Sequence, residues 1–157
     1  MPSLEHHYQV RTVWTGNTGQ GTATYGGYSR AHEISIANKP PILGTTDVPR
    51  FHDESRYTPE ELLVAALSAC HMMWLLHLCA DAGVTVVSYT DDALGKMRQH
   101  GPTGQFSEVT LRPVMKITDA SRIPDAVTLH QKAHELCNIA RSVNFPVYCT
   151  PSVTAGE

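Results

Sequence analysis

The sequence predicts an α+β domain in which two core helices pack on an antiparallel sheet. Segments that alternate apolar and polar residues occur near both ends of the chain and between two helical patterns, so the element order is β-β-β, α, β-β, α, β. The chain has 157 residues and contains no internal repeat and no obvious linker. We therefore expect a single domain over residues 1–157.

Composition limits the classes of partner. Twelve basic residues against fifteen acidic ones give a formal net charge of −3, which predicts neither a nucleic-acid partner nor binding to an anionic membrane. The N-terminus lacks the basic and apolar regions of a signal peptide, so we expect a cytoplasmic protein. In that reducing compartment its four cysteines would be thiols, and a disulfide would be transient.

The first third of the chain is predicted to be β-structure. Residues 8–15 alternate, 15–21 are typical of a turn, and 30–38 alternate again with Ile34 and Ile36 on one face, which favours an antiparallel meander. Residues 39–56 are rich in Pro, Asp, Gly and Ser and indicate a long loop. Loops of that length often border functional sites.

The first helix has clear start and stop signals. Thr58 is a typical N-cap, Pro59 suits the first helical position, and Glu61 completes a capping box. Gly83 ends the helix. These signals predict a helix that begins after Thr58 and ends before Gly83.

This helix is apolar on almost every side, and its length is close to that of a membrane span. Ser68, His71 and His77 interrupt the apolar run, and no second such segment exists in the sequence. We therefore expect no membrane, and interpret the helix as the centre of a protein core. Because one sheet face cannot cover it, the helix also predicts a homodimer.

The second half of the chain continues the mixed pattern. Pro113 within the second predicted strand indicates an edge or a bulge. The expected elements are strands at 84–98 and 107–118 with a hairpin at 99–105, an amphipathic helix at 123–143, and a terminal strand at 145–153.

Two cysteines fall on the two predicted helices. Cys70 and Cys137 can meet if the helices pack at about 8–10 Å, although a small buried hydrophobe is the commonest role of a free cysteine. Cys79 lies nine residues after Cys70, about half a turn away around the helix. Cys149 lies in the terminal strand. We interpret Cys79 and Cys149 as structural.

Metal binding is the alternative chemistry. His130, His134 and Cys137 recur at i, i+4 and i+7 on one predicted helix, and His71 could supply a fourth zinc ligand. The sequence has neither a Cys-x-x-Cys nor a His-Glu-x-x-His motif to strengthen this pattern. A non-enzymatic zinc-binding or small-molecule-binding protein therefore stays the alternative function.

Two quoted segments resemble a known family. "TPEELLVAALSACH", followed 67 positions after its cysteine by the cysteine of "HELCNIARSVNFPV", is similar to the osmotically inducible protein C and organic hydroperoxide resistance family (OsmC/Ohr). The resemblance covers most of the chain. It implies an intertwined homodimer that acts as a thiol-dependent peroxidase on organic hydroperoxides, without a cofactor. It also implies that a dithiol reductant, commonly a lipoylated protein, regenerates the enzyme.

The resemblance also assigns residues. Cys70 corresponds to the peroxidatic cysteine, which forms a sulfenic acid, and Cys137 to the resolving cysteine, which closes an intramolecular disulfide. Glu60 corresponds to the acidic residue that orients an arginine beside the reactive sulfur. For that arginine we select Arg30, with Arg50 and Arg56 as competitors.

The implied chemistry agrees with general thiol chemistry. A free cysteine is mostly protonated at neutral pH, and a permanently charged arginine nearby favours the reactive thiolate. A neighbouring thiol protects the sulfenic acid from further oxidation.

Glu60 and Cys70 are ten residues apart on one helix, or about 15 Å along its axis. We therefore expect Glu60 and its arginine to act on Cys70 of the partner subunit. His71 either tunes the thiolate or is a hydrogen-bonded core histidine.

Overall fold

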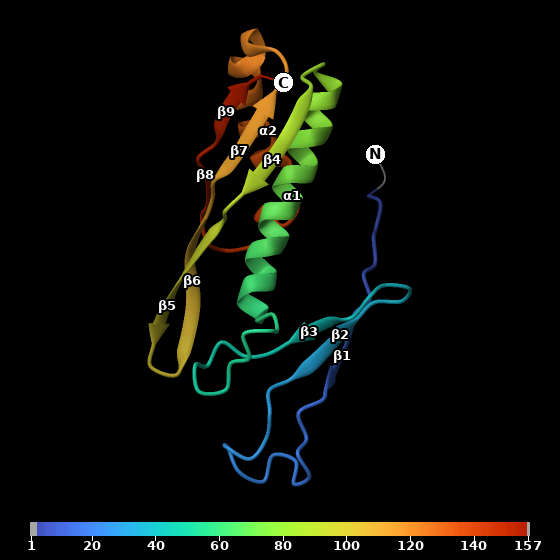
Figure 1. Ribbon diagram of the computed structural model, residues 1–157, viewed down its shortest axis with the longest axis vertical. Coiled ribbons are helices and arrows are strands. Elements are labelled where there is room, and N and C mark those ends of the chain that lie inside the picture. The colour runs from blue at the N-terminus through green and yellow to red at the C-terminus, as the bar shows by residue number, and fades with distance from the viewer. Residues whose placement is uncertain (1–2, 157) are drawn as a thin grey trace. The chain divides into compact units, whose positions relative to one another are not determined.

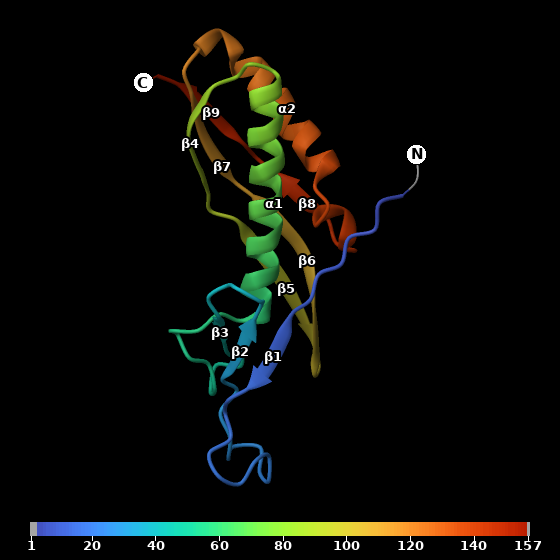
Figure 2. The ribbon, with the colours of Figure 1, turned by 90° about the vertical axis from the view of Figure 1, so that its right-hand side faces the viewer.

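The computed structural model describes residues 3–156, so residues 1, 2 and 157 of the predicted domain lie outside the described part (Figures 1 and 2). The described chain forms two compact units, divided between Leu62 and Leu63. Its elements mix strands with two α-helices, which confirms the predicted α+β class.

The first unit contains a meander of three short strands. β1 (Arg11–Trp14) pairs antiparallel with β2 (His32–Ser35), which pairs antiparallel with β3 (Ile42–Gly44). The predicted meander is therefore confirmed, but β3 lies inside the segment 39–56 that was predicted to be a loop. β3 has only three residues and follows two prolines, so it is too short to show an alternating pattern. Periodicity therefore could not predict it.

Helix α1 (Pro59–Asp81) begins and ends as predicted. The backbone N–H of Thr58 donates to Glu61 Oε2 at 2.9 Å, and the N–H of Glu61 donates to Thr58 Oγ1 at 3.2 Å, so the capping box is formed. Gly83 adopts a φ of 69°, and the N–H of Val84 then bonds back to the carbonyl of Cys79 at 2.8 Å. This is a Schellman-type end, which glycine adopts without steric cost.

The second unit contains two three-stranded sheets. One has the order β4-β7-β9, from β4 (Val86–Asp91), β7 (Pro113–Ile117) and β9 (Ser152–Ala155). The other has the order β5-β6-β8, from β5 (Leu94–His100), β6 (Thr103–Leu111) and β8 (Val147–Cys149). The β4–β7 and β5–β6 pairs are antiparallel, but β8 pairs parallel to β6 and β9 parallel to β7. The expectation of an antiparallel sheet is corrected to mixed sheets.

Each of the three strands predicted in this half divides into two. Where the chain passes from one sheet to the other, Asp91 Oδ1 accepts from the Arg112 N–H at 2.7 Å and Arg112 Nε donates to the Asp92 carbonyl at 2.7 Å. These side-chain bonds replace ladder bonds at the crossing. Pro113, which has no N–H, is the first residue of β7. The register shifts that mark bulges or irregular pairing lie elsewhere, at Val86/Ser88 and Lys96/Met97. Pro113 therefore marks a strand start rather than an edge or a bulge.

The predicted hairpin at 99–105 is confirmed. His100 pairs with Thr103 across a two-residue turn, and its first central residue, Gly101, has a φ of 59°. A positive φ at that position is what a type II′ turn requires.

Both helices cover one face of β7, the face that carries Met115 and Ile117 (Figures 1 and 2). α1 contributes a buried stripe repeating every fourth residue: Leu67, His71, Leu75 and Cys79. The other sides of α1 are covered less, and Met73 is 63% exposed.

By length and composition α1 could also cross a membrane, but core helices of soluble proteins pass the same test. The homodimer predicted from this apolar surface stays a prediction.

Helix α2 is shorter than predicted. It spans Ile123–Leu136, and Cys137 leaves the helix with φ −63° and ψ 109°. The N–H of Ala140 donates to Cys137 Sγ at 3.4 Å and the Ser142 hydroxyl donates to the Asn138 carbonyl at 2.7 Å, so local bonds replace helical ones. Cys137 therefore ends the helix instead of lying on its face, which corrects the prediction of a helix over 123–143.

Candidate functional site

Cys70 and Cys137 lie next to each other. Cys70 is in the middle of α1 and Cys137 caps the C-terminus of α2, and the Cys70 side chain is near enough to influence the pKa of Cys137. Cys137 is 1% exposed, whereas Cys70 is partly exposed, and both are free thiols. The two residues that the resemblance pairs are therefore neighbours, and the more accessible one is the predicted peroxidatic residue.

The surroundings of Cys137 keep it protonated. Burial, and next the hydrogen bond with the Cys70 thiol, raise the pKa of Cys137 to about 11, although the Ala140 N–H acts in the opposite direction. At neutral pH its thiol is therefore a weak nucleophile toward a solute. Such a thiol suits a reaction with a neighbouring, already oxidised sulfur better than first attack on a peroxide.

The other two cysteines differ from each other. Cys79 is 1% exposed and packs in an apolar cluster with Leu75, Met115 and Ile117, where burial raises its pKa. The Sγ of Cys149 lies 3.6 Å from Nε2 of His71. No spacing in the sequence indicates that Cys149 and His71 meet, because 78 residues separate the two positions.

His71 belongs to a buried histidine pair. Its Nε2 lies 3.0 Å from Nδ1 of His130, and the two side chains are 0% and 1% exposed. Burial, and next His134, lower the pKa of His71 to about 4, while burial followed by His71 lowers the pKa of His130 to about 4. His71 is thus a hydrogen-bonded core histidine. Of the predicted zinc set, His71 and His130 meet, but Cys149 takes the place expected for Cys137.

In the first unit, Arg30 is held by aromatic rings and carbonyls. Its guanidinium carbon lies 3.9 Å from the ring centre of Tyr28, 3.6 Å from that of Phe51 and 4.8 Å from that of Tyr25. Its nitrogens donate to the carbonyls of Tyr28 at 2.7 Å and Tyr25 at 2.6 Å. Cation–π contacts and two hydrogen bonds therefore fix the charge in one place.

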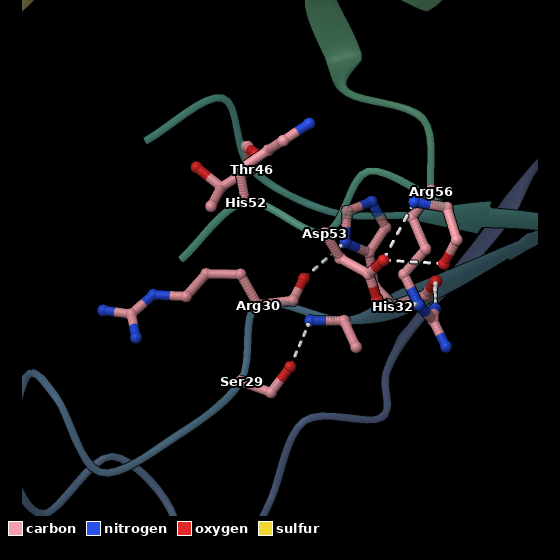
Figure 3. Close-up of polar contacts among 9 residues, drawn as sticks. Ser29, Arg30, His32, Thr46, His52, Asp53 and Arg56 are labelled. Carbon is pink, nitrogen blue, oxygen red and sulfur yellow. Dashed lines mark hydrogen bonds and ion pairs between the residues drawn. The ribbon is translucent and has the colours of Figure 1, made fainter. Parts of the chain in front are cut away.

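Arg30 and Glu60 line the same cavity, of about 420 Å³, within the first unit. Glu60 Oε2 is buried and has no hydrogen-bond partner in the described part of the chain. The competing arginines do not line this cavity. Arg56 pairs with Asp53 at 3.4 Å, and Arg50 lies 5.2 Å from the ring centre of Phe51. Figure 3 shows the Arg30 side chain extending away from the Asp53–Arg56 pair.

Comparisons with known proteins agree with this fold. A model of the OsmC-like protein family matches residues 52–151. An OsmC-like protein of unknown function from Vibrio cholerae is 30% identical, with a TM-score of 0.82 over 94% of this chain and 99% of the other. An organic hydroperoxide resistance protein from Elizabethkingia anophelis is 17% identical, with a TM-score of 0.66 over 98% of this chain and 100% of the other.

The organic hydroperoxide resistance protein OhrB of Bacillus subtilis is also 17% identical, with a TM-score of 0.57 over 94% of this chain and 98% of the other. The sequence matches no protein with a curated description.

Proposed function

Because the chain belongs to the family of OsmC-like proteins, we propose that it is a cysteine-based peroxidase that reduces organic hydroperoxides. Two solved structures of similar fold are named organic hydroperoxide resistance proteins, but at 17% identity they support the fold alone. The proposal therefore depends on one observation in this chain, that the Cys70 side chain lies near enough to Cys137 to influence its pKa.

The proposed cycle begins at Cys70. Its thiolate attacks the terminal oxygen of the hydroperoxide, the O–O bond breaks, and the departing alkoxide takes a proton to leave as an alcohol. Cys70 becomes a sulfenic acid. The Cys137 thiol then attacks that sulfur, a disulfide forms, and water leaves. A dithiol reductant, for which a lipoylated protein is a candidate, then reduces the disulfide to two thiols and is itself oxidised to a disulfide. This step suits the reducing cytoplasm in which we propose that the protein acts.

We assign the activation of Cys70 to Arg30 and Glu60. Glu60 has a buried carboxylate oxygen without a partner in the described chain, and it lines the same cavity as Arg30. That carboxylate can hold the Arg30 guanidinium once the arginine leaves the carbonyls of Tyr25 and Tyr28. Because Glu60 lies about 15 Å along α1 from Cys70 of its own chain, the pair would act on Cys70 of the partner subunit in a homodimer.

Mixed dimers test this assignment across subunits. Cys70→Ser and Glu60→Gln chains are each expected to be nearly inactive as pure dimers. A heterodimer of the two chains should recover about half of the wild-type activity, because one of its two sites is complete. If Glu60 instead serves Cys70 of its own chain, the heterodimer has no complete site and stays inactive. Arg30→Lys, which loses the planar fork, should lower activity more than Arg50→Lys.

Turnover with a lipoyl dithiol against several hydroperoxides tests the activity itself. We expect consumption of alkyl hydroperoxides by the wild type and by Cys79→Ser, whose sulfur lies in an apolar cluster, but not by Cys70→Ser. The alternative, a zinc-binding or small-molecule-binding protein, is favoured by the contact of His71, His130 and Cys149. It predicts no peroxide-dependent loss of thiols, and stoichiometric zinc in place of turnover.

A further inference from the structure

We infer that His71, His130 and Cys149 form a buried Zn²⁺ site joining α1, α2 and the end of β8. The site would use His71 Nε2, His130 Nδ1 and Cys149 Sγ. It differs from the proposed redox pair in every ligand and does not depend on the peroxidase activity.

The distances between the three atoms suit one metal ion. Nε2 of His71 lies 3.0 Å from Nδ1 of His130 and 3.6 Å from Sγ of Cys149, and all three atoms lie within 4.8 Å of one another. With Zn–N bonds of about 2.0–2.1 Å and a Zn–S bond of about 2.3 Å, tetrahedral ligand atoms lie roughly 3.3 Å apart for two nitrogens and 3.6 Å for nitrogen and sulfur. Only small side-chain movements are needed to bind an ion.

Burial and unmet hydrogen-bonding capacity point the same way. His71 and His130 are 0% and 1% exposed, yet His71 Nδ1 and His130 Nε2 have no partner in the described part of the chain. Two buried rings that share one hydrogen bond leave much of their polar capacity unused, which is costly in a core.

The charges near the site would balance a divalent ion. Asp91 lies within electrostatic reach of both His71 and Cys149, and its carboxylate is fixed by the Ser68 hydroxyl at 2.5 Å and the Arg112 N–H at 2.7 Å. One thiolate and one carboxylate together neutralise Zn²⁺, which lowers the cost of burying it. Tyr89, whose buried hydroxyl has no partner in the described chain, also interacts with Cys149. It can donate to the thiolate or to a water at the fourth position.

The donor set selects the class of ion. Two imidazole nitrogens and one thiolate suit zinc or copper, whereas Mg²⁺ and Ca²⁺ prefer oxygen. Because a cysteine binds zinc as its thiolate, binding at Cys149 must release a proton. Zn²⁺ affinity should therefore rise with pH.

The test uses the full chain, stripped of metal with a chelator and kept reduced. We expect one Zn²⁺ per chain by calorimetry, with release of a proton. Co²⁺ should give the intense visible bands of a tetrahedral site together with a sulfur-to-cobalt charge-transfer band. The charge-transfer band should disappear in Cys149→Ser and persist in the control Cys79→Ser, whose sulfur lies deeper than that of Cys149, in an apolar cluster.

Three results would overturn the inference. The first is that the folded wild type binds no Zn²⁺ and shows no tetrahedral Co²⁺ spectrum. The second is that the charge-transfer band persists in Cys149→Ser but disappears when Cys70 and Cys137 are replaced, which would place the metal on the redox pair. The third is tight binding of Cu⁺ alone. The wild-type measurements decide the matter even if a variant fails to fold, which circular dichroism would detect.

Discussion

The C-terminal part and the middle of α1 have different chemistry. Toward the C-terminus, Leu75 and Cys79 pack in an apolar cluster. In the middle, Cys70 lies beside a second thiol, and His71 contacts a second histidine and a third cysteine. Cys79 and Cys137 are each 1% exposed, so burial alone does not distinguish a cysteine of the apolar core from the one proposed to resolve Cys70. The two differ in the groups beside them.

Replacing Cys70 should have the largest effect. Cys70→Ser removes the attacking sulfur, so we expect peroxidase turnover to fall by about 10³-fold or more. Cys79→Ser is the matched control, because it changes the same type of residue on the same helix in apolar surroundings. Steady-state rates with a lipoyl dithiol measure the difference. Equal losses in both variants would erase the contrast between the middle and the C-terminal part of α1.

Replacing Cys137 should separate attack from protection. In Cys137→Ser, Cys70 can still form a sulfenic acid, but no thiol beside it can close a disulfide. We expect one equivalent of hydroperoxide to give a trappable sulfenic acid, and excess hydroperoxide to inactivate the variant within a few turnovers through a sulfinic acid. Mass spectrometry of the Cys70 peptide measures both. A variant as resistant to excess peroxide as the wild type would show that Cys137 does not resolve Cys70.

The histidine pair should make stability depend on pH between about 6.5 and 4. The folded-state pKa values of His71 and His130 are lowered to about 4 by burial, so the unfolded chain binds protons in this range that the folded chain does not. The free energy of unfolding should therefore fall as pH falls from 6.5 to 4, by roughly 3 kcal/mol for each histidine. Asp53 and Asp119, whose pKa values are lowered by Ser55 and Ser121, act only below their usual value of 3.8.

Denaturant unfolding of metal-free protein at several pH values measures this slope. The double variant His71→Gln/His130→Gln should have a flatter slope, whatever its absolute stability. His77→Gln is the control, because His77 is exposed and pairs with Asp81 on the surface of α1. A slope that is unchanged in the double variant would mean that the buried pair titrates normally.

The smallest effect is expected at the N-terminus of α1, away from both the middle and the C-terminal part of the helix. Thr58→Ala removes one side of the capping box and should lower the free energy of unfolding by about 1 kcal/mol. Thr128→Ala, in the exposed part of α2, removes a hydroxyl that only bonds back to the Pro124 carbonyl and should have little effect. Chemical denaturation of the two variants distinguishes them, and equal losses would contradict a specific role of the cap.

Local signals in the sequence predicted the local structure. Thr58, Glu61 and Gly83 act through bonds within a few residues, so the ends of α1 could be predicted from spacing alone. The helical patterns indicated only that Cys70 and Cys137 could meet, and the resemblance to the family paired them. The end of α2 could not be predicted. It depends on local bonds around Cys137 and Asn138, and no glycine or proline marks the position in the sequence.

Long-range pairing could not be predicted in the same way. Alternation shows that residues 145–153 are extended, but not that β8 and β9 run parallel to their partners. Similarly, no spacing connects Cys149 with His71, because the contact depends on which sheet β8 joins. The helical spacing on α2 correctly indicated His130, but it predicted Cys137 as the sulfur partner in place of Cys149. Helical periodicity compares only residues of one helix, and Cys149 lies in a strand.

Peptide mapping after reaction with one equivalent of cumene hydroperoxide identifies which thiols of the protein react. We expect each chain to lose two thiols and to gain a disulfide joining Cys70 to Cys137, while Cys79 and Cys149 stay reduced. Unchanged thiols, or a disulfide that includes Cys79 or Cys149 in place of Cys137, would contradict this expectation.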